Sequence, residues 1–290
     1  ITELTGMISR RSLYYTKNAA SENSVAQLQD SSGNVFFSRG EHTYVNGKCK
    51  YCRLPEYSLD RGSHLENYAY SFIHSLTIEE IFNVKFDVII GNPPYQLQDA
   101  GDSTGASPIY QLFVEQAKKL EPKYISMIIP SRWFAGGKGL DDFRANMLAD
   151  KRLSHLVDYH DAWDCFPGVE IKGGVCYFLW NSNHNGPCSV TPIVSNKVLP
   201  SMERNLDEFD VLIRHHEQVS VLKKVLDKNE ISLESSISRQ KPFGFRTNFK
   251  DFVAEPFPGC VKIFARDAIG YVSRSLVQVN YDWIDKKLIN

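Results

Sequence analysis

Short apolar runs alternate, along the middle of the chain, with longer stretches in which apolar residues recur every three or four positions. The short runs predict buried strands, and the periodic stretches predict amphipathic helices. The strand-like runs are residues 87–91, 124–130, 152–160 and 173–180, and the helix-like stretches are 1–15, 107–122 and 140–150. Strands that alternate with helices predict an α/β fold with parallel strands.

Two flanking regions lack this alternation. Residues 16–66 are poor in apolar periodicity and rich in Ser, Asn, Gly and charge, so we interpret them as an insertion. After Asn181 the apolar runs shorten, and a second unit begins near residues 186–200. We therefore expect three parts, which are residues 1–85, 86–185 and 186–290.

Composition narrows the class of protein. The chain has 290 residues, of which 42% are hydrophobic and 23% charged, as in ordinary globular proteins. The net charge of −1 gives no overall basic field, so a nucleic acid would have to meet a local basic patch. No apolar run approaches the roughly 18 residues of a membrane span, and no secretion signal opens the chain. We predict a cytoplasmic protein without a membrane partner.

The stretch DVIIGNPPYQ, residues 87–96, places polar groups at the end of a predicted strand. The double proline, Pro93 and Pro94, stops the strand and stiffens the loop. The side-chain oxygen of Asn92 and the carbonyl of Pro93 can accept both hydrogens of an aromatic amine, which turns its lone pair toward an electrophile. Tyr95 offers a ring on which a base can stack. The simpler alternative is a rigid turn in which Asn92 caps and Tyr95 packs.

FDVIIGNPPY, residues 86–95, resembles the catalytic motif of the adenine-N6 DNA methyltransferases of type II restriction-modification systems. The stretches YISMIIPSRWFAGGKG and DCFPGVEIKGGVCYFLW are similar to later parts of the same family. The resemblance implies S-adenosylmethionine as methyl donor, double-stranded DNA as substrate and a flipped adenine held between Tyr95 and Phe166. The alternative for Phe166 is an aromatic residue of the core.

The resemblance also implies a Rossmann-like methyltransferase sheet, followed by part of a target-recognition domain from residue 186 onward. Residues 1–85 would then hold an N-terminal helix and a cysteine-containing insertion. The family's glycine-bearing cofactor motif does not occur in the chain, so we expect a segment of a longer protein, with the sheet incomplete at its N-terminus. Such a segment would be inactive by itself. The candidate cofactor residues are Asn92, Glu3 as a ribose contact, and His74 near the cofactor's adenine.

Cys49 and Cys52 have the C-x2-C spacing that presents two thiolates to one zinc ion. His42, His64 or His74 could complete a tetrahedral structural site. The alternative is two unligated cysteines in a solvent-facing insertion. A catalytic metal is not expected, because methyl transfer from a sulfonium needs no Lewis acid.

Basic residues occur in two places that suit contacts with DNA phosphates. Arg239, Lys241 and Arg246 alternate with phenylalanines in a stretch that either binds DNA or forms a solvated loop. Arg132 and Lys138 follow a predicted strand end.

Two other functions use the same residues. A protein-glutamine methyltransferase also orients a planar amide with an NPPY loop, and a DNA-binding module could keep the fold without catalysis. The long polar loop after Tyr95 and the second unit favour DNA methylation. The implied partners are DNA and a restriction or helicase subunit or domain.

Overall fold

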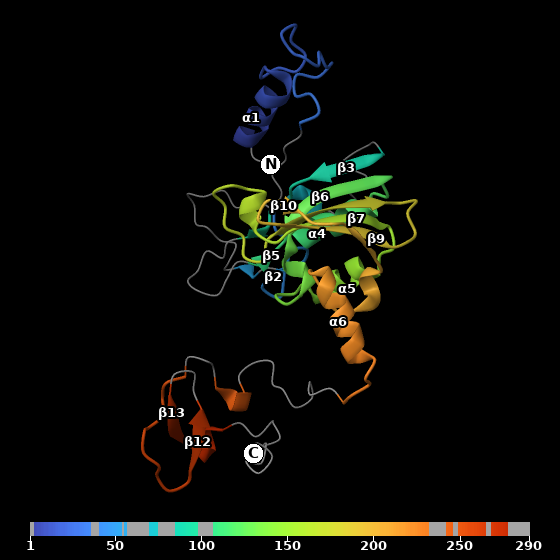
Figure 1. The fold of residues 1–290 in the computed structure, drawn as a ribbon. Helices are drawn as coiled ribbons and strands as arrows, with labels where there is room; N and C mark the ends of the chain where they lie inside the picture. Colours follow the sequence, from blue (N-terminus) through green and yellow to red (C-terminus); the bar gives the residue numbers. More distant parts are fainter. Residues whose placement is uncertain are drawn as a thin grey trace. The chain divides into compact units, whose positions relative to one another are not determined.

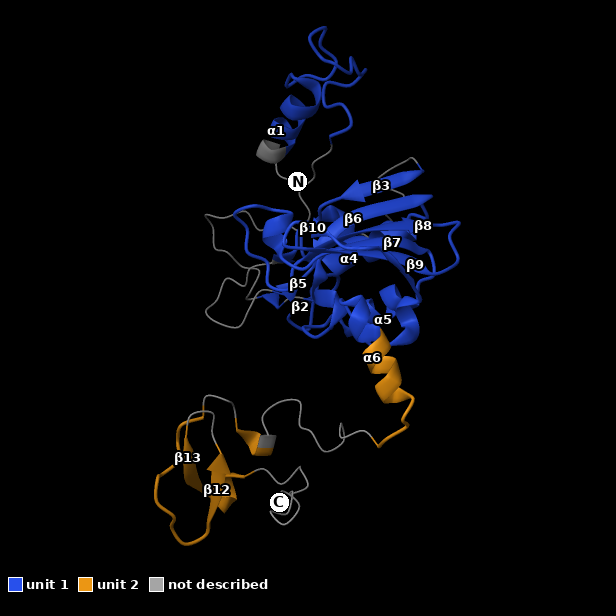
Figure 2. Cartoon of the chain, in the orientation of Figure 1, with its two compact units in different colours: residues 1–219 blue, residues 220–290 orange. Residues whose placement is uncertain are grey.

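The computed structural model describes residues 3–35, 41–53, 55–56, 70–74, 85–97, 107–231, 242–245, 249–264 and 268–277. The chain divides into two compact units, residues 1–219 and 220–290 (Figure 2). No described helix has the length and apolar character that crossing a membrane requires.

The centre of the first unit is a mixed sheet of seven strands (Figure 1). Its order is β3-β6-β8-β7-β9-β10, and β11 also pairs with β9. The strands are β3 (Val88–Gly91), β6 (Tyr124–Pro130), β7 (Leu153–Tyr159), β8 (Val175–Asn181), β9 (Cys188–Val194), β10 (Lys197–Val198) and β11 (Met202–Arg204). The predicted α/β class is confirmed, and the four predicted strands are present.

The expected parallel arrangement holds for only part of this sheet. β3 pairs parallel with β6, and β7 pairs parallel with β9, but β8 is antiparallel to both of its neighbours. The reason is the connection after β7, which returns at the same edge, so that Tyr159 lies opposite Val175. β9 to β11 also belong to this sheet, and the boundary between the two units therefore lies later than residue 186.

The predicted helices are present, and two of them cover one face of the sheet. α4 (Tyr110–Lys119) and α5 (Asp141–Ala149) share a buried apolar cluster with alternate residues of β6 and β8. Ile125, Ile129 and Phe178 in this cluster have no exposed surface. The alternation follows from strand geometry, in which successive side chains point to opposite faces.

The opposite face is more exposed than the apolar sequence of β3 predicts. Val88 is 53% exposed and Ile90 76%, and Tyr124, which pairs with Val88, is 39% exposed. The prediction of a buried β3 was wrong for these side chains. β3 is the edge strand of the described sheet, so its outer side lacks the second neighbour that burial requires.

The remaining elements are short. α1 (Glu3–Tyr14) confirms the first predicted helix, and Tyr14 packs with Ala19 and Val35. β1 (Tyr44–Val45) pairs with β2 (Lys48–Cys49), and β4 (Gln96–Leu97) pairs with β5 (Ser107–Pro108). The second unit holds most of α6 (His216–Leu226) and the hairpin of β12 (Cys260–Phe264) and β13 (Ile269–Ser273). Short 3-10 helices include η1 (Ser71–Ile73), η2 (Ser131–Phe134), η3 (Ala162–Asp164), η4 (Leu206–Glu208) and η7 (Arg274–Leu276).

Asp150 joins the helices to the sheet. Its carboxylate accepts hydrogen bonds from Lys118 Nζ at 2.8 Å, Arg152 Nε at 2.7 Å and Trp180 Nε1 at 2.9 Å. Burial alone would raise the pKa of Asp150, but the hydrogen bonds from Arg152, Lys118 and Trp180 hold this pKa well below its ordinary value. The folded state therefore favours the ionised carboxylate.

We predict that Asp150→Ala lowers the free energy of unfolding by about 2 to 3 kcal/mol at neutral pH, because it leaves buried donors without an acceptor. The depressed pKa means that this stability is present above the ordinary aspartate pKa of about 3.9 and is lost as the pH falls below it. Urea unfolding at several pH values measures the loss. The control is Asp207→Ala, whose exposed ion pair with Lys151 should contribute less than about 1 kcal/mol. Equal losses in the two variants would contradict the prediction.

Candidate functional site

The NPPY loop begins where β3 ends. Gly91, the last residue of β3, lies opposite Met127 of β6, and the chain then leaves the sheet. Asn92 is exposed, Pro93 is buried, and Pro94 and Tyr95 are half-buried. Because neither proline has an N–H group to continue the ladder, the strand stops here and the side chain of Asn92 is left at the sheet edge.

Tyr95 has a hydrogen-bonded backbone and a buried phenol oxygen. Its carbonyl accepts a hydrogen bond from the Ile109 N–H at 3.3 Å, and the β4–β5 ladder closes the segment that follows. Its phenol oxygen is buried without a hydrogen-bond partner among the described residues. Burial, followed by the neighbouring thiols of Cys165 and Cys176, raises the pKa of Tyr95 to about 12. Tyr95 is therefore a neutral phenol at physiological pH.

Phe166 lies on the connection between β7 and β8. This connection leaves the sheet after Tyr159 and returns at Val175, which also lies opposite Pro130 at the end of β6. Phe166 is half-buried, and its N–H donates to the Ala162 carbonyl at 2.7 Å. The thiol of Cys165, the preceding residue, contributes to the raised pKa of Tyr95.

The structure thus brings Asn92, Tyr95 and Phe166 to one edge of the sheet. The alternative that Phe166 is a core aromatic does not hold, since it lies outside the buried cluster of the sheet. No ring contact joins Tyr95 to Phe166, both of which are described. Two half-buried aromatic side chains on separate loops, with a polar acceptor beside them, form a candidate base-binding site.

A buried charge network, which the sequence did not predict, connects β7 to both ends of the loop that carries Phe166. Asp158 is 2% exposed and accepts hydrogen bonds from Ser131 Oγ at 2.9 Å and from Arg214 Nε at 2.7 Å and Nη2 at 2.6 Å. Arg214 also donates to the carbonyls of Tyr159 and Gly173, at the two ends of the Phe166 loop. An aspartate at a buried position of a strand was the available sequence signal, but its distant partner Arg214 had none.

Arg132 and Lys138 also lie near this edge. Arg132 is in η2, directly after β6, and Lys138 is in the following loop; both are exposed. Neither has a carboxylate partner among the ion pairs of the described chain. The other predicted DNA contacts, Arg239, Lys241 and Arg246, lie outside the described residues.

The structure does not place the candidate cofactor residues in one site. Glu3 begins α1, but its side chain lies outside the described part of the structure. His74 ends η1, where its ring lies against His42 with centroids 4.7 Å apart. Of the three candidates, only Asn92 belongs to the NPPY loop. His74 instead belongs to a cluster of cysteine and histidine side chains.

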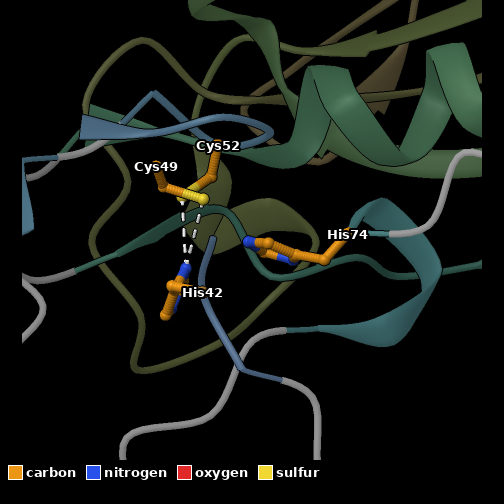
Figure 3. A group of neighbouring side chains, drawn as sticks. All are labelled: His42, Cys49, Cys52 and His74. Carbon is orange, nitrogen blue, oxygen red and sulfur yellow. Dashed lines mark hydrogen bonds between the residues drawn. The ribbon is translucent and has the colours of Figure 1, made fainter. Parts of the chain in front are cut away.

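This cluster consists of His42, Cys49, Cys52 and His74 (Figure 3). The ligand atoms of these four residues all lie within 4.8 Å of one another. Cys49 has no exposed surface and Cys52 is 8% exposed, so neither cysteine faces solvent, even if the insertion that carries them does. Burial, followed by the neighbouring His74, lowers the pKa of His42 to about 4. The residue types and spacing suit a metal ion; His64 lies outside the described residues.

Comparisons with known proteins give a family and one sequence relative. The family described as Eco57I restriction-modification methylase matches residues 1–166. A Mycoplasma pneumoniae protein described as an uncharacterized adenine-specific methylase is 35% identical over 255 residues. The match covers 78% of this chain and 60% of the relative, so the chain spans less than two thirds of the relative's length.

Solved structures resemble the chain more distantly. A type I restriction-modification methyltransferase subunit from Streptococcus thermophilus is 11% identical, with a TM-score of 0.31, and covers 57% of this chain and 36% of its own. A modification subunit of a putative type I restriction enzyme from Vibrio vulnificus is 11% identical, with a TM-score of 0.29. The match covers 50% of this chain and 32% of that subunit. At these scores the structural likeness carries no argument.

The Asp158–Arg214 pair gives a prediction about stability. We expect Asp158→Asn and Arg214→Gln each to cost about 3 kcal/mol of unfolding free energy, because the first leaves a half-buried guanidinium and the second a buried carboxylate without its partner. The double variant should cost about 1 to 3 kcal/mol less than the sum of the two. Urea unfolding of all four proteins measures this coupling.

The control for that cycle is the exposed pair Lys151 and Asp207, whose atoms approach to 2.7 Å. Its coupling should stay below about 1 kcal/mol. Hydrogen exchange supplies a second measurement, because residues 160–174 should exchange faster in Asp158→Asn. An additive cycle with unchanged exchange would show that the network does not hold the Phe166 loop.

Proposed function

The chain belongs to the Eco57I restriction-modification methylase family, and we propose that it carries the catalytic site of an adenine-specific DNA methylase. The observation that carries this proposal is the NPPY loop at the carboxyl end of β3, with the acceptor side chain of Asn92 exposed beside Tyr95. The sheet, with its antiparallel β8, supports a Rossmann-like methyltransferase core. Because the chain spans 60% of its relative, the activity of the whole protein is part of the proposal.

Asn92 and Pro93 orient the amine in this proposal. The exocyclic N6 of adenine is a poor nucleophile, because its lone pair is delocalised into the ring. The Asn92 side-chain oxygen and the Pro93 carbonyl accept its two hydrogens and favour a tetrahedral nitrogen whose lone pair faces the methyl donor. The two prolines keep these acceptors ordered before the base arrives, so their ordering is not a cost of binding.

Tyr95 and Phe166 hold the adenine ring. A base inside a duplex is out of reach, so the enzyme flips it out of the helix and stacks it between aromatic side chains. One observation supports these roles: both residues are half-buried at one sheet edge. The Asp158–Arg214 network keeps the Phe166 loop in place.

S-adenosylmethionine supplies an electrophilic methyl group when it is bound. Asn92, at the end of β3, is the residue of this chain that fits beside it. The glycine-bearing turn that binds this cofactor in the family does not occur within residues 1–290, and Glu3 stays a candidate for a ribose contact. The residues in this chain that fit the cofactor are therefore only part of a complete binding site.

DNA contacts complete the proposal. Arg132 and Lys138 are exposed near the site edge, where they can meet phosphates that flank the flipped base. We assign Arg239, Lys241 and Arg246 to a target-recognition segment in the second part of the chain. A restriction subunit or domain as partner fits the family name, and a helicase stays a second candidate. The family match supports DNA as the substrate over a protein amide.

Methyl transfer tests the proposal directly. Tritiated S-adenosylmethionine and unmethylated DNA should yield label on adenine, and Asn92→Ala should lower the rate by about 100-fold or more, because an acceptor for the reacting amine is lost. Asn183→Ala removes an exposed asparagine outside the site and should leave the rate unchanged. Label that appears on protein, or an active Asn92→Ala variant, would refute the assignment.

Tyr95 allows a finer test of the stacking role. Tyr95→Phe should bind DNA that carries 2-aminopurine at the target position within about threefold of wild type, because the phenol oxygen has no hydrogen-bond partner in the described structure. Tyr95→Ala and Phe166→Ala should weaken binding by about 1 to 3 kcal/mol. If Tyr95→Phe lost as much binding affinity as Tyr95→Ala, the hydroxyl group rather than the ring would be responsible.

A further inference from the structure

The four side chains of the cysteine and histidine cluster converge on one point, although they come from separate segments (Figure 3). Cys49 ends β2, Cys52 follows in the next turn, His42 precedes β1, and His74 closes η1. His42 Nδ1 lies 3.4 Å from Cys49 Sγ and 3.7 Å from Cys52 Sγ. Zinc bonds of about 2.3 Å to sulfur and 2.1 Å to nitrogen, at tetrahedral angles, place nitrogen and sulfur about 3.6 Å apart. These distances match that geometry.

His74 is oriented as a metal ligand would be. Its Nδ1 lies 2.8 Å from the Tyr70 carbonyl, so this nitrogen carries the proton and donates it. Nε2 is then left with its lone pair, and it is buried without a hydrogen-bond partner among the described residues. A backbone carbonyl on one ring nitrogen is the usual device that fixes the tautomer and aims the other nitrogen at a metal.

We propose that His42, Cys49, Cys52 and His74 bind one zinc ion in a closed, tetrahedral structural site. Two sulfur and two nitrogen donors are a set that zinc prefers, and four protein ligands leave no open position for a substrate. The surroundings are apolar, since the cysteines pack with Ile109, Tyr51, Tyr70, Leu112 and Phe113. The site is distinct from the methyl-transfer centre.

The zinc ion would connect the insertion to the NPPY loop. β1 and β2 contain two residues each and are too short to be stable alone, so a metal can supply the missing folding free energy. The cysteines pack on Ile109, whose N–H donates to the Tyr95 carbonyl. η1 packs on α4, where the Tyr70 and Phe72 rings contact Phe113. The site therefore supports the segment that positions Tyr95.

Metal analysis of the purified chain tests the proposal without any activity assay. We expect about one equivalent of zinc per chain, and at least a tenfold reduction in Cys49→Ser, Cys52→Ser, His42→Ala and His74→Ala. Cobalt(II) added to the metal-free protein should give the visible bands of a tetrahedral site and a thiolate charge-transfer band. Circular dichroism of each variant shows whether the rest of the chain still folds.

Matched variants show which side chains hold the metal. Cys260→Ser and His155→Ala alter residues elsewhere in the chain and should keep the zinc. His64→Ala should also keep it, because His74 is assigned as the fourth ligand. Two results would overturn the proposal: folded wild-type protein that neither contains zinc nor takes up cobalt, or zinc that is lost in His64→Ala and retained in His74→Ala.

Discussion

The ladder between β3 and β6 is the constraint from which the candidate active site follows. Parallel pairing of these strands places their carboxyl ends at one edge, where Asn92 follows Gly91 and Ser131 follows Pro130. The antiparallel β8 starts at the same edge, because Val175 lies opposite both Pro130 and Tyr159. Loops that are distant in sequence therefore meet, as they do at the carboxyl edge of other open α/β sheets.

Buried charges then decide how well those loops are held. Asp158 binds Ser131 and Arg214, and Arg214 reaches the carbonyls at both ends of the loop that carries Phe166. On the helical side, Asp150 joins α4 to β8 through Lys118 and Trp180. A carboxylate out of water must be paired, so each network restricts its elements to one arrangement.

The cysteine and histidine cluster is linked to the NPPY loop through Ile109. The cysteines pack on Ile109, whose N–H donates to the Tyr95 carbonyl, so the cluster contacts the segment that holds the backbone of Tyr95. A rigid Tyr95 matters for the proposed function, because an amine that is misplaced by about 1 Å loses much of the rate that orientation provides. Structural metal and catalysis would thus be linked through one hydrogen bond.

Local patterns in the sequence determined four strands of the main sheet, three helices and the NPPY loop, because period, proline and glycine act within a few residues. The tertiary structure alone decided that β8 runs antiparallel, that β9 joins the main sheet and that Val88 and Ile90 are exposed. It also placed His74, one of the three histidines that the sequence allowed, beside Cys49 and Cys52, and it paired Arg214 with Asp158. These outcomes depend on which distant segments pair, and one chain read along its length contains no signal for contacts between residues so far apart.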